Sequence, residues 1–444
     1  MPQPTYPGAL SILRTLRAYG HDALLAGGCV RDRLRGIEPK DFDIATSARP
    51  DQVQAAFPLT EPVGAAFGVM LVILDGAAYE VATFRKDGPY IDGRRPEGVE
   101  FASPEEDASR RDFTVNGLFY DPDADLVMDF VHGQADLRAG ILRAIGDPAA
   151  RFQEDRLRVL RCVRFACQLG FAIEPHTWAA VKSFAGRLEG LARERIAQEL
   201  TKILCSPRPR LGLELLEQAG LLNDVLPELL PQMGCTQPPE FHPEGDVWEH
   251  TLRVVQSVAD DGPSSKRLAW AALLHDVAKP ATRTVSDRIR FHGHESAGAE
   301  MARAICARLK LSGELTDGVC ALVADHLRLD PIKRMKLSTL KRLLRRDDLE
   351  DLLALHKADC LGSHGDLELY VIARAKQAEF ARADAADSLR PEPLLDGADL
   401  IAWGYDPGPA FKEILTVVED EQLEGRLADK AAARAFVEGR FTKA

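Results

Sequence analysis

The 444-residue sequence lacks the marks of a membrane-spanning or exported protein. No apolar run approaches the roughly 18 residues of a membrane-spanning helix, and the stretch 67–74, among the longest, is typical of a strand. The N-terminus has no charged start followed by an apolar stretch, so we expect no secretory signal. The eight cysteines form no C-x-x-C pair, which argues against a disulfide framework and a zinc site. We therefore predict a cytoplasmic protein without a membrane partner, with reduced and mostly buried thiols.

The chain also lacks an excess of positive charge, because its 56 Lys and Arg residues are outnumbered by 68 Asp and Glu. The net charge of −12 argues against general nucleic-acid binding. The balance is reversed between residues 143 and 210, where 13 basic residues face seven acidic ones and leave a local charge of +6. Such a basic stripe is the electrostatic footprint expected for a phosphate backbone. A solvated helical face is the alternative that this pattern leaves open.

The composition is that of a globular protein with several domains. The chain is 45% hydrophobic and 28% charged, and it is too long for one core. Short strands and helices are predicted up to residue 146, and from Asp147 onward the apolar spacing is helical. We predict an α+β N-terminal part followed by an all-α remainder. The expected divisions are 1–146, 147–235, 236–365 and 366–444.

Two glycines and two aspartates form the most informative stretch. Gly27 and Gly28 end an apolar run and open a predicted helix, and a short strand over 41–45 then carries Asp41 and Asp43. Residues two apart on a strand share a face, so both carboxylates point one way and Phe42 points into the core. Mg²⁺ is usually held by one or two carboxylates plus substrate phosphates, and glycines let backbone N–H groups approach a phosphate. Although an isolated Asp-x-Asp is more often a solvated turn, this order of elements predicts a site for a metal–nucleoside triphosphate.

Further elements follow in the first half of the chain. Asp75-Gly76 lies between two apolar runs and predicts a hairpin. The stretch Ser103–Glu106 is a capping box, from which we expect a helix to run into residues 109–116. Beyond Asp147 a helix is predicted, and Glu154, Asp155, Arg158 and Arg161 are expected to share one polar face of it.

These motifs resemble those of a known family. Gly27-Gly28-Cys29-Val30-Arg31-Asp32 with Asp41-Phe42-Asp43, then Arg110-Arg111-Asp112-Phe113-Thr114-Val115-Asn116, then Glu154-Asp155-Arg156-Leu157-Arg158 are similar to the head and neck motifs of class II tRNA nucleotidyltransferases. These are the CCA-adding enzymes, with the bacterial poly(A) polymerases as close relatives. The resemblance covers roughly the first 230 residues. It implies a DNA polymerase β-like head at 1–146 and a helical neck and RNA-binding region at 147–235.

The resemblance also implies roles for individual residues. Asp41 and Asp43 are expected to be catalytic metal ligands for Mg²⁺. The expected nucleotide-binding residues are Gly28, Arg31, Arg111, Asp112, Asn116, Asp155, Arg158 and Arg161. A carboxylate and a guanidinium can accept from and donate to the edge that cytosine and adenine share, so Asp155 and Arg158 are predicted to read the base. Salt bridges on a helix surface are the alternative for this set.

A loop in the head bears on the product. Relatives that add only CC have a shortened loop after the second hairpin strand. Here Asp87, Tyr90, Asp92, Arg95 and Pro96 match the intact loop, which favours addition of the terminal A. Addition of A alone and poly(A) synthesis stay open as products.

Histidines and aspartates gather in the second half. His275-Asp276 and further histidines on flanking predicted helices form a metal-binding constellation that resembles the HD phosphohydrolase superfamily. The resemblance implies an HD domain at 236–365, followed by a helical tail at 366–444. Residue-by-residue matching gives the ligands His250, His275, Asp276, His294, His326 and Asp359, enough for two divalent transition metals of unknown identity, with His292 as the alternative to His294. A structural helical domain without activity is the other interpretation.

Together the motifs predict a tRNA nucleotidyltransferase. We expect it to add CCA to tRNA from CTP and ATP, with an HD-domain phosphatase or 2′,3′-cyclic phosphodiesterase activity of the kind found in enterobacterial relatives. Hydrolysis of RNA-end phosphates as the main activity is an alternative from another reaction class. A tRNA-binding protein with inactive sites is a third, against which the intact carboxylates speak. The sequence leaves the oligomeric state open.

Overall fold

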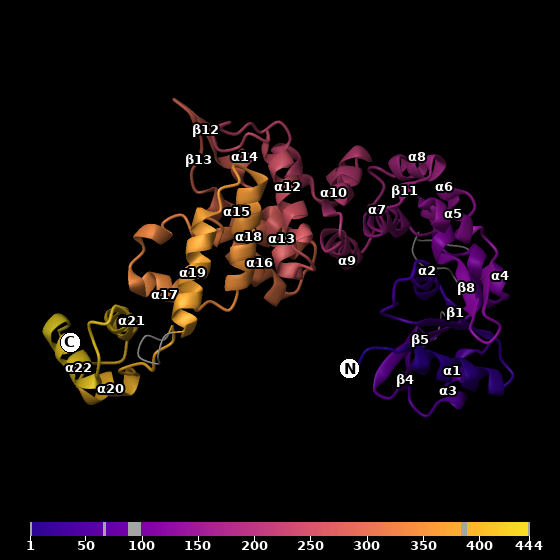
Figure 1. The fold of residues 1–444 in the computed structure, drawn as a ribbon, viewed down its shortest axis with the longest axis horizontal. Helices are drawn as coiled ribbons and strands as arrows, with labels where there is room; N and C mark the ends of the chain where they lie inside the picture. The colour runs from indigo at the N-terminus through magenta and orange to yellow at the C-terminus, as the bar shows by residue number, and fades with distance from the viewer. Residues whose placement is uncertain (1, 65–67, 88–98, 383–388, 443–444) are drawn as a thin grey trace. The chain divides into compact units, whose positions relative to one another are not determined.

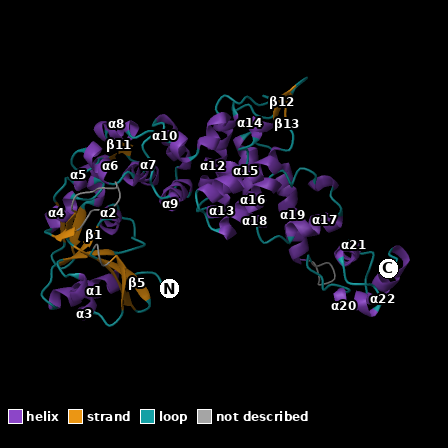
Figure 2. Cartoon of the chain, turned by 180° about the vertical axis from the view of Figure 1, so that it is seen from behind, coloured by secondary structure: helices purple, strands orange, loops and turns teal. Residues whose placement is uncertain are grey.

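The computed structural model describes residues 2–64, 68–87, 99–382 and 389–442. The chain divides into two compact units, Met1–Pro227 and Glu228–Ala444. The first unit combines a mixed sheet with helices and the second is almost wholly helical (Figure 2), which confirms the predicted fold class. The finer division into four domains stays a prediction. Within the described ranges, no helix is long and apolar enough to cross a membrane.

A seven-stranded sheet is the framework of the first unit, in the order β3-β4-β5-β2-β1-β8-β9. Its strands are β1 (Ala23–Ala26), β2 (Asp43–Thr46), β3 (Thr60–Gly64), β4 (Val69–Leu74), β5 (Ala77–Thr83), β8 (Leu118–Asp121) and β9 (Leu126–Asp129). Strands β2 and β5 pair in parallel and the other neighbours pair antiparallel. Helices α1 (Tyr6–Ala18) and α3 (Pro50–Ala56) lie beside the sheet (Figure 1).

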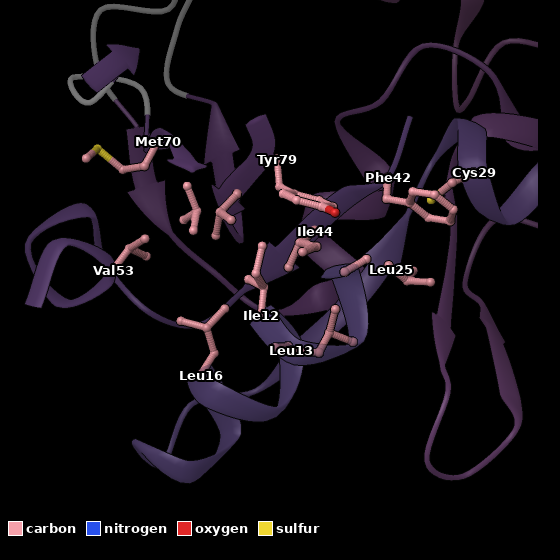
Figure 3. Packing of buried hydrophobic residues seen from close by; sticks show 14 of the residues in the cluster. Ile12, Leu13, Leu16, Leu25, Cys29, Phe42, Ile44, Val53, Met70 and Tyr79 are labelled. Atoms are coloured by element: carbon pink, nitrogen blue, oxygen red, sulfur yellow. The ribbon is translucent and has the colours of Figure 1, made fainter. Parts of the chain in front are cut away.

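The core of this unit lies between α1 and the sheet. Ile12 and Leu16 of α1 point toward Ile44 and Tyr79 of the strands (Figure 3), and all four are buried. Burial of each such side chain stabilises the fold by about 1.5–3 kcal/mol. Phe42 belongs to the same cluster, as predicted, and this fixes the approach to β2.

The hairpin predicted at Asp75-Gly76 is confirmed. The turn joins β4 to β5, whose pairs run from Val69–Ala82 to Leu74–Ala77. Both turn residues have positive φ, 51° at Asp75 and 77° at Gly76. A two-residue turn of this hand matches the twist of the strands, and it favours Asp-Gly because glycine tolerates the second position.

The helix begun by the capping box is shorter than predicted. Ser103 and Glu106 form the box, and α4 (Pro104–Ser109) follows, but it ends before Arg110. Phe113 is extended and bridges to Ala144, so the chain turns there before the 3₁₀ helix η2 (Thr114–Asn116). The expectation of one helix running into 109–116 was therefore wrong, because the buried Phe113 is held in extended backbone.

The helix expected beyond Asp147 is also interrupted. Asp147 caps α6 (Pro148–Glu154), but Asp155 has φ −138° and ψ 102°, and α7 (Leu157–Leu169) begins after it. The expectation that one continuous helix carries Glu154, Asp155, Arg158 and Arg161 on a single face was therefore wrong. Asp155 accepts the backbone N–H of Leu157 at 3.0 Å, a local bond that competes with the helical ladder.

Smaller elements complete the first unit. They are α2 (Gly28–Leu34), α5 (Gly133–Ala139), α8 (Pro175–Ser183), α9 (Arg193–Leu204), α10 (Pro209–Gln218), α11 (Leu222–Val225), the pair β6 (Arg85–Asp87) and β7 (Val99–Phe101), and the pair β10 (Ile141–Leu142) and β11 (Ala172–Ile173). Tyr90, Asp92, Arg95 and Pro96 of the product-related loop lie outside the described residues.

The second unit is a stack of helices with one short hairpin. Its elements are η3 (Pro227–Gln232, from the last residue of the first unit), α12 (Val247–Asp260), α13 (Lys266–Leu274), α14 (Lys279–Thr282), β12 (Arg283–Val285), β13 (Ile289–Phe291), α15 (His294–Arg308), α16 (Gly313–Asp325), η4 (Ile332–Arg334), α17 (Leu337–Leu344), α18 (Leu349–Gly362), α19 (Glu368–Arg382), α20 (Gly397–Ala402), α21 (Pro409–Leu423) and α22 (Lys430–Arg440). The last three helices bury a small core of their own. The eight cysteines are unpaired and all but Cys205 are buried, as expected.

Candidate functional sites

An arginine-rich cleft of about 850 Å³ opens beside the sheet of the first unit. Its lining includes the arginines Arg31, Arg85, Arg110, Arg111, Arg158, Arg161, Arg164 and Arg195 and the acids Asp43, Glu80, Asp112 and Asp155. All eight residues predicted to bind a nucleotide line it, as does Asp43, whereas Asp41 does not. The excess of guanidinium groups suits a polyanion such as a triphosphate.

Gly27 brings two walls of the cleft together. It precedes α2 with a φ of 70° that disfavours other residues. A Cβ at this position would lie 2.9 Å from Nη1 of Arg111 and 3.8 Å from Oδ2 of Asp43. The absence of a side chain therefore lets the Arg111 guanidinium and the Asp43 carboxylate approach the same backbone.

The carboxylates of the cleft crowd one another. Asp43 is the first residue of β2, not the third of a strand from Asp41 as predicted, and Asp41 is an exposed residue just before it. The parallel register of Ile44 with Val81 puts Asp43 beside Glu80. Reduced hydration within the cleft, and then the negative charges of Glu80 and Asp41, raise the pKa of Asp43 to about 6. A bound cation would relieve this repulsion.

Glu80 is a cleft residue that the sequence reasoning missed. It is the one charged residue of β5, and its side chain lies on the opposite face from the buried Tyr79 and Val81. That alternation was the available signal. Its significance depends on the pairing of β5 with β2, which only the sheet reveals.

Four predicted residues form one hydrogen-bonded chain. Arg31 donates to Oδ1 of Asn116 at 2.7 Å, and Asn116 donates to Oδ1 of Asp112 at 3.1 Å. Nε of Arg161 donates to Oδ2 of Asp112 at 2.8 Å. Although burial opposes it, this guanidinium lowers the pKa of Asp112 to about 2. Asp112 is thus saturated by protein partners, and the geometry suits it to orienting Arg161 and Asn116.

An aromatic ring gathers three of the arginines. The guanidinium carbons of Arg31, Arg161 and Arg164 lie 5.6, 5.4 and 3.9 Å from the centre of the Phe165 ring. Cation–π attraction partly offsets the repulsion among these like charges. Asp107 also reduces repulsion between neighbouring arginines, because its buried carboxylate binds Arg110 and Arg111. The sequence analysis did not identify this residue.

Of the two predicted base readers, Asp155 lies at the helix break and Arg158 lies in the first turn of α7. Arg195, which the sequence reasoning did not single out for this role, donates to Oδ2 of Asp155 at 2.9 Å. Arg158 is buried and donates to Oε2 of Glu154 at 2.7 Å and to the carbonyl of Arg110 at 2.9 Å. Arg158 therefore forms a salt bridge, but with a buried guanidinium and across the helix break, and both readers line the cleft.

The basic stripe is partly neutralised within the fold. Eight of its 13 basic side chains form ion pairs with acids: Arg143, Arg151, Arg158, Arg161, Arg164, Arg195, Lys202 and Arg210. Arg156 donates to two backbone carbonyls. Among the described residues, Lys182, Arg187, Arg193 and Arg208 form no ion pair with an acid, and together with Arg156 they can offer charge to a phosphate backbone.

In the second unit, all six residues predicted as metal ligands come together. His250 lies on α12, His275 and Asp276 follow α13, His294 opens α15, His326 follows α16, and Asp359 lies on α18. Their ligand atoms form two groups, one of His250, His275 and Asp359 and the other of Asp276, His294 and His326, with all atoms of a group within 4.8 Å of one another. His292 lines the adjoining cavity but belongs to neither group.

Hydrogen bonds fix the tautomers of three of these histidines. The Nδ1 atoms of His275, His294 and His326 lie 2.9, 2.7 and 2.7 Å from backbone carbonyl oxygens. A carbonyl only accepts, so Nδ1 carries the hydrogen and Nε2 keeps its lone pair. The Nε2 atoms of His294 and His326 face each other at 3.2 Å, an arrangement that a cation between them would stabilise.

The buried carboxylates of the centre carry negative charge that a bound cation would balance. Burial opposes ionisation, but neighbouring His275 and Lys279 lower the pKa of Asp276. Oδ1 of Asp276 accepts no hydrogen bond from the described residues and lies 3.4 Å from Nε2 of His294. Although burial opposes it, Asp359 and Glu244 raise the pKa of His250 to about 9. Imidazole nitrogens with carboxylate oxygens are the donor set of a divalent transition metal, so the residues fit such an ion.

A cavity of about 610 Å³ adjoins these groups. Phe241, Phe291, Arg288 and Arg290 line it together with members of both groups. Two further lining residues form an ion pair, with Nζ of Lys279 2.7 Å from Oδ2 of Asp276. Aromatic and basic side chains beside a metal-binding centre suit a ligand that carries a base and a phosphate.

Family models match three segments of the chain. "Poly A polymerase head domain" covers residues 23–143, "Probable RNA and SrmB- binding site of polymerase A" covers 170–233, and "HD domain" covers 247–362. The CCA-adding enzyme of Streptococcus pneumoniae is 32% identical over 443 residues, across 96% of this chain and 95% of that protein. The chain belongs to the tRNA nucleotidyltransferase and poly(A) polymerase family.

Other relatives of this chain differ in the extent of the match. The CCA-adding enzyme of Geobacillus thermodenitrificans is 44% identical over 228 residues, or 51% of this chain, which spans just over half (56%) of that relative. The A-adding tRNA nucleotidyltransferase of Deinococcus radiodurans is 34% identical over 432 residues, 94% of this chain and 95% of that one. The structure of Bacillus stearothermophilus CCA-adding enzyme in complex with CTP superposes with a TM-score of 0.76 at 28% identity, over 99% and 98% of the two chains.

Proposed function

We propose that this nucleotidyltransferase adds CCA to tRNA 3′ ends from CTP and ATP, with Mg²⁺, in the cytoplasm. The observation that carries the proposal is that Asp43 and all eight predicted nucleotide-binding residues line one arginine-rich cleft. Full-length similarity to CCA-adding enzymes supports it further. The region 1–146 would carry the chemistry, 147–235 the RNA contacts, 236–365 the HD activity and 366–444 a helical tail.

In this mechanism the RNA 3′-hydroxyl attacks the α-phosphate of the nucleotide, and the bond to the leaving pyrophosphate breaks. Asp43, with Asp41, would hold Mg²⁺, which would lower the pKa of the attacking hydroxyl and offset the charge of the phosphates. Arg111 and Arg31 bind the negative charge of the triphosphate. Asp112 holds Asn116 and Arg161 in place through the hydrogen bonds described above.

Base choice is assigned to Asp155 and Arg158. Each oxygen of Asp155 has lone pairs beyond those used by Arg195 and the Leu157 N–H, so it can accept an exocyclic amino group. The guanidinium of Arg158 has five N–H donors, of which its protein partners use some. Cytosine and adenine present the matching edge, whereas uracil and guanine do not.

The products of different RNA substrates test this function. The assay offers tRNA lacking CCA, tRNA lacking only A, and an unrelated oligonucleotide, each with CTP, ATP or both. We expect CCA on the first, one A on the second and no extension of the third. Addition of A alone, with no use of CTP, would assign the A-adding activity named for the Deinococcus radiodurans relative. Unlimited A addition to the oligonucleotide would assign poly(A) synthesis.

A second activity is favoured by the two ligand groups of the HD domain. We propose that this centre, with a divalent transition metal, hydrolyses 2′,3′-cyclic or terminal phosphates of RNA ends. When bound, the metal would supply an activated water and polarise the phosphate. Release of phosphate from such ends should require His275 and Asp276, and retention of this activity in His275→Ala with Asp276→Ala would refute the assignment.

A further inference from the structure

One of the four histidines in the HD centre is held differently from the others. His275, His294 and His326 have Nδ1 next to backbone carbonyls, whereas Nδ1 of His250 lies 2.8 Å from Oε1 of Glu244. A backbone carbonyl is available as an acceptor whichever residue supplies it, whereas a carboxylate acceptor requires Asp or Glu at that position. His250 is thus the member whose orientation depends on another side chain.

Glu244 is built into the protein interior. It lies in the loop before α12, six residues from His250, and its side chain has no exposed surface. The same Oε1 atom is 2.8 Å from Nδ1 of His242, whose ring packs edge-on to that of His250 at 5.0 Å. A carboxylate is costly to bury unless its partners are charged or donate strongly. Two imidazole N–H groups meet that need.

We propose that Glu244 is a positioning residue of the HD centre: by accepting the Nδ1–H of His250, it directs Nε2 toward His275 and Asp359, where this nitrogen would coordinate a metal ion in place of a proton. Nε2 of His250 lies 3.2 Å from Nε2 of His275 and 3.0 Å from Oδ1 of Asp359. Without the carboxylate acceptor, rotation or the other tautomer would present an N–H to these groups and remove a ligand. The inference rests on the metal-dependent centre proposed above.

A separate metal ion on His242, Glu244 and His250 is the competing interpretation, since these three also form a compact group. Oε2 of Glu244 has no hydrogen-bond partner among the described residues and would be available to it. However, Nδ1 of His250 would then have to use its lone pair to bind that separate ion. Nε2 could then bind a second ion, with His275 and Asp359, only if the ring lost both protons and became an imidazolate. The hydrogen-bonded arrangement keeps Nε2 available at no such cost.

The experiment loads the full-length protein with Co²⁺. Bound metal is counted by elemental analysis, affinity is measured by competition with a chromophoric chelator, and visible absorption reports the coordination. Glu244→Ala and Glu244→Leu remove the acceptor, and Leu also fills the buried space. Glu244→Gln keeps an acceptor oxygen and serves as the matched control. His275→Ala with Asp276→Ala removes one ligand from each of the two groups and supplies the background of Co²⁺ bound elsewhere. Thermal unfolding with CTP incorporation checks each fold.

We expect the Ala and Leu variants to bind Co²⁺ about 10–100-fold more weakly, with an altered absorption spectrum, while Gln stays close to wild type. His242→Phe should leave the number of bound ions unchanged. Wild-type affinity in folded Glu244→Leu would overturn the role of Glu244 alone. One further ion in the wild type, lost in His242→Phe, would assign a separate metal site instead. No Co²⁺ above background in the wild type would overturn the metal centre itself.

Discussion

The cleft of the first unit is lined by eight arginines and four carboxylates, whereas the HD centre gathers four histidines and two aspartates. In the cleft, reduced hydration and then the nearby charge of Glu80 raise the pKa of Asp43 to about 6. In the centre, basic neighbours lower the pKa values of Asp276 and Asp359. The cleft therefore has few ready ligands and a surplus of groups that bind phosphate. The centre holds a nearly complete donor set of its own.

This difference indicates two ways to bind a metal ion. A hard cation in the cleft needs oxygens from the triphosphate to complete its shell, as is common for Mg²⁺. The centre offers enough nitrogen and oxygen donors for a transition metal before any substrate arrives. The metals of the two sites should consequently differ in identity, in affinity and in their dependence on nucleotide.

Independent loss of the two activities is the largest expected effect. Asp43→Ala removes the one predicted metal ligand that lines the cleft, so nucleotide incorporation should fall by about 10²–10³-fold, the range seen when charge stabilisation at a reaction centre is lost. Hydrolysis of 2′,3′-cyclic phosphate by the same variant should be unchanged. Radiolabelled CTP incorporation and phosphate release, measured on one preparation, check this.

The reciprocal variant provides the control. His275→Ala with Asp276→Ala should abolish hydrolysis and leave CTP incorporation intact. Loss of both activities in either protein, with a normal melting temperature, would refute two independent sites.

Metal retention tests the comparison directly. After gel filtration in metal-free buffer, the protein should keep its transition metal and lose Mg²⁺, because only the HD centre supplies most of the donors itself. Mn²⁺ binding to the cleft, followed by electron paramagnetic resonance, should tighten when a non-hydrolysable CTP analogue is present. Tight Mn²⁺ binding to the cleft without nucleotide would contradict the proposed difference.

The comparison also explains what could be read from the sequence. Local patterns predicted the β4–β5 hairpin, the capping box at Ser103 and the burial of Phe42, because short-range chemistry decides these features. The six predicted ligands of the HD centre do meet, but that prediction came from the resemblance to the HD superfamily and not from local patterns. Other features that depend on neighbours distant in the chain were missed.

Glu80 and Asp155 show the reason. Nothing near Glu80 in the sequence places it beside Asp43, because a parallel strand pair brings them together. Asp155 looked like one more residue of an amphipathic helix, yet its side chain binds Arg195, 40 residues away, and the N–H of Leu157. The tertiary bond to Arg195 and the local bond to Leu157 together outweigh the modest propensity of a single residue to continue a helix.

The next largest expected effect is a loss of selectivity between nucleotide bases. Asp155→Ala or Arg158→Ala removes one side of the predicted reading pair, and a good base contact is worth about 1–3 kcal/mol of discrimination. We expect the ratio of kcat/KM for CTP over UTP to fall by about 5–150-fold while the triphosphate still binds. Arg85→Ala, which also removes a cleft guanidinium, is the matched control and should weaken all nucleotides alike. An unchanged ratio in both reader variants would exclude them from base reading.

Asp112→Asn should destabilise the first unit. Because Arg161 lowers its pKa from about 4 to about 2, the ionised carboxylate contributes about 2 kcal/mol. This contribution is complete above the unfolded-state pKa and is lost as pH falls through the folded-state pKa. Urea unfolding should show a constant deficit between pH 5 and 8 that shrinks near pH 3. Glu217→Gln, on an exposed helix face, should show none, and a deficit that grows on acidification would contradict the mechanism.

The smallest expected effect concerns the acid limit of nucleotide transfer. Protonation of Asp43 removes a metal ligand, so incorporation at subsaturating Mg²⁺ should decline as pH falls toward the pKa of about 6. Glu80→Gln removes the like charge that helps to raise this pKa, so the decline should move to lower pH, by less than about one unit.

Glu61→Gln makes the same change on β3 outside the cleft and should leave the profile in place. An unmoved profile in Glu80→Gln would mean that hydration of the cleft alone sets the titration of Asp43. Hydrolysis at the HD centre should keep its acid limit in Glu80→Gln, because Asp276 and Asp359 owe their low pKa values to neighbours of their own.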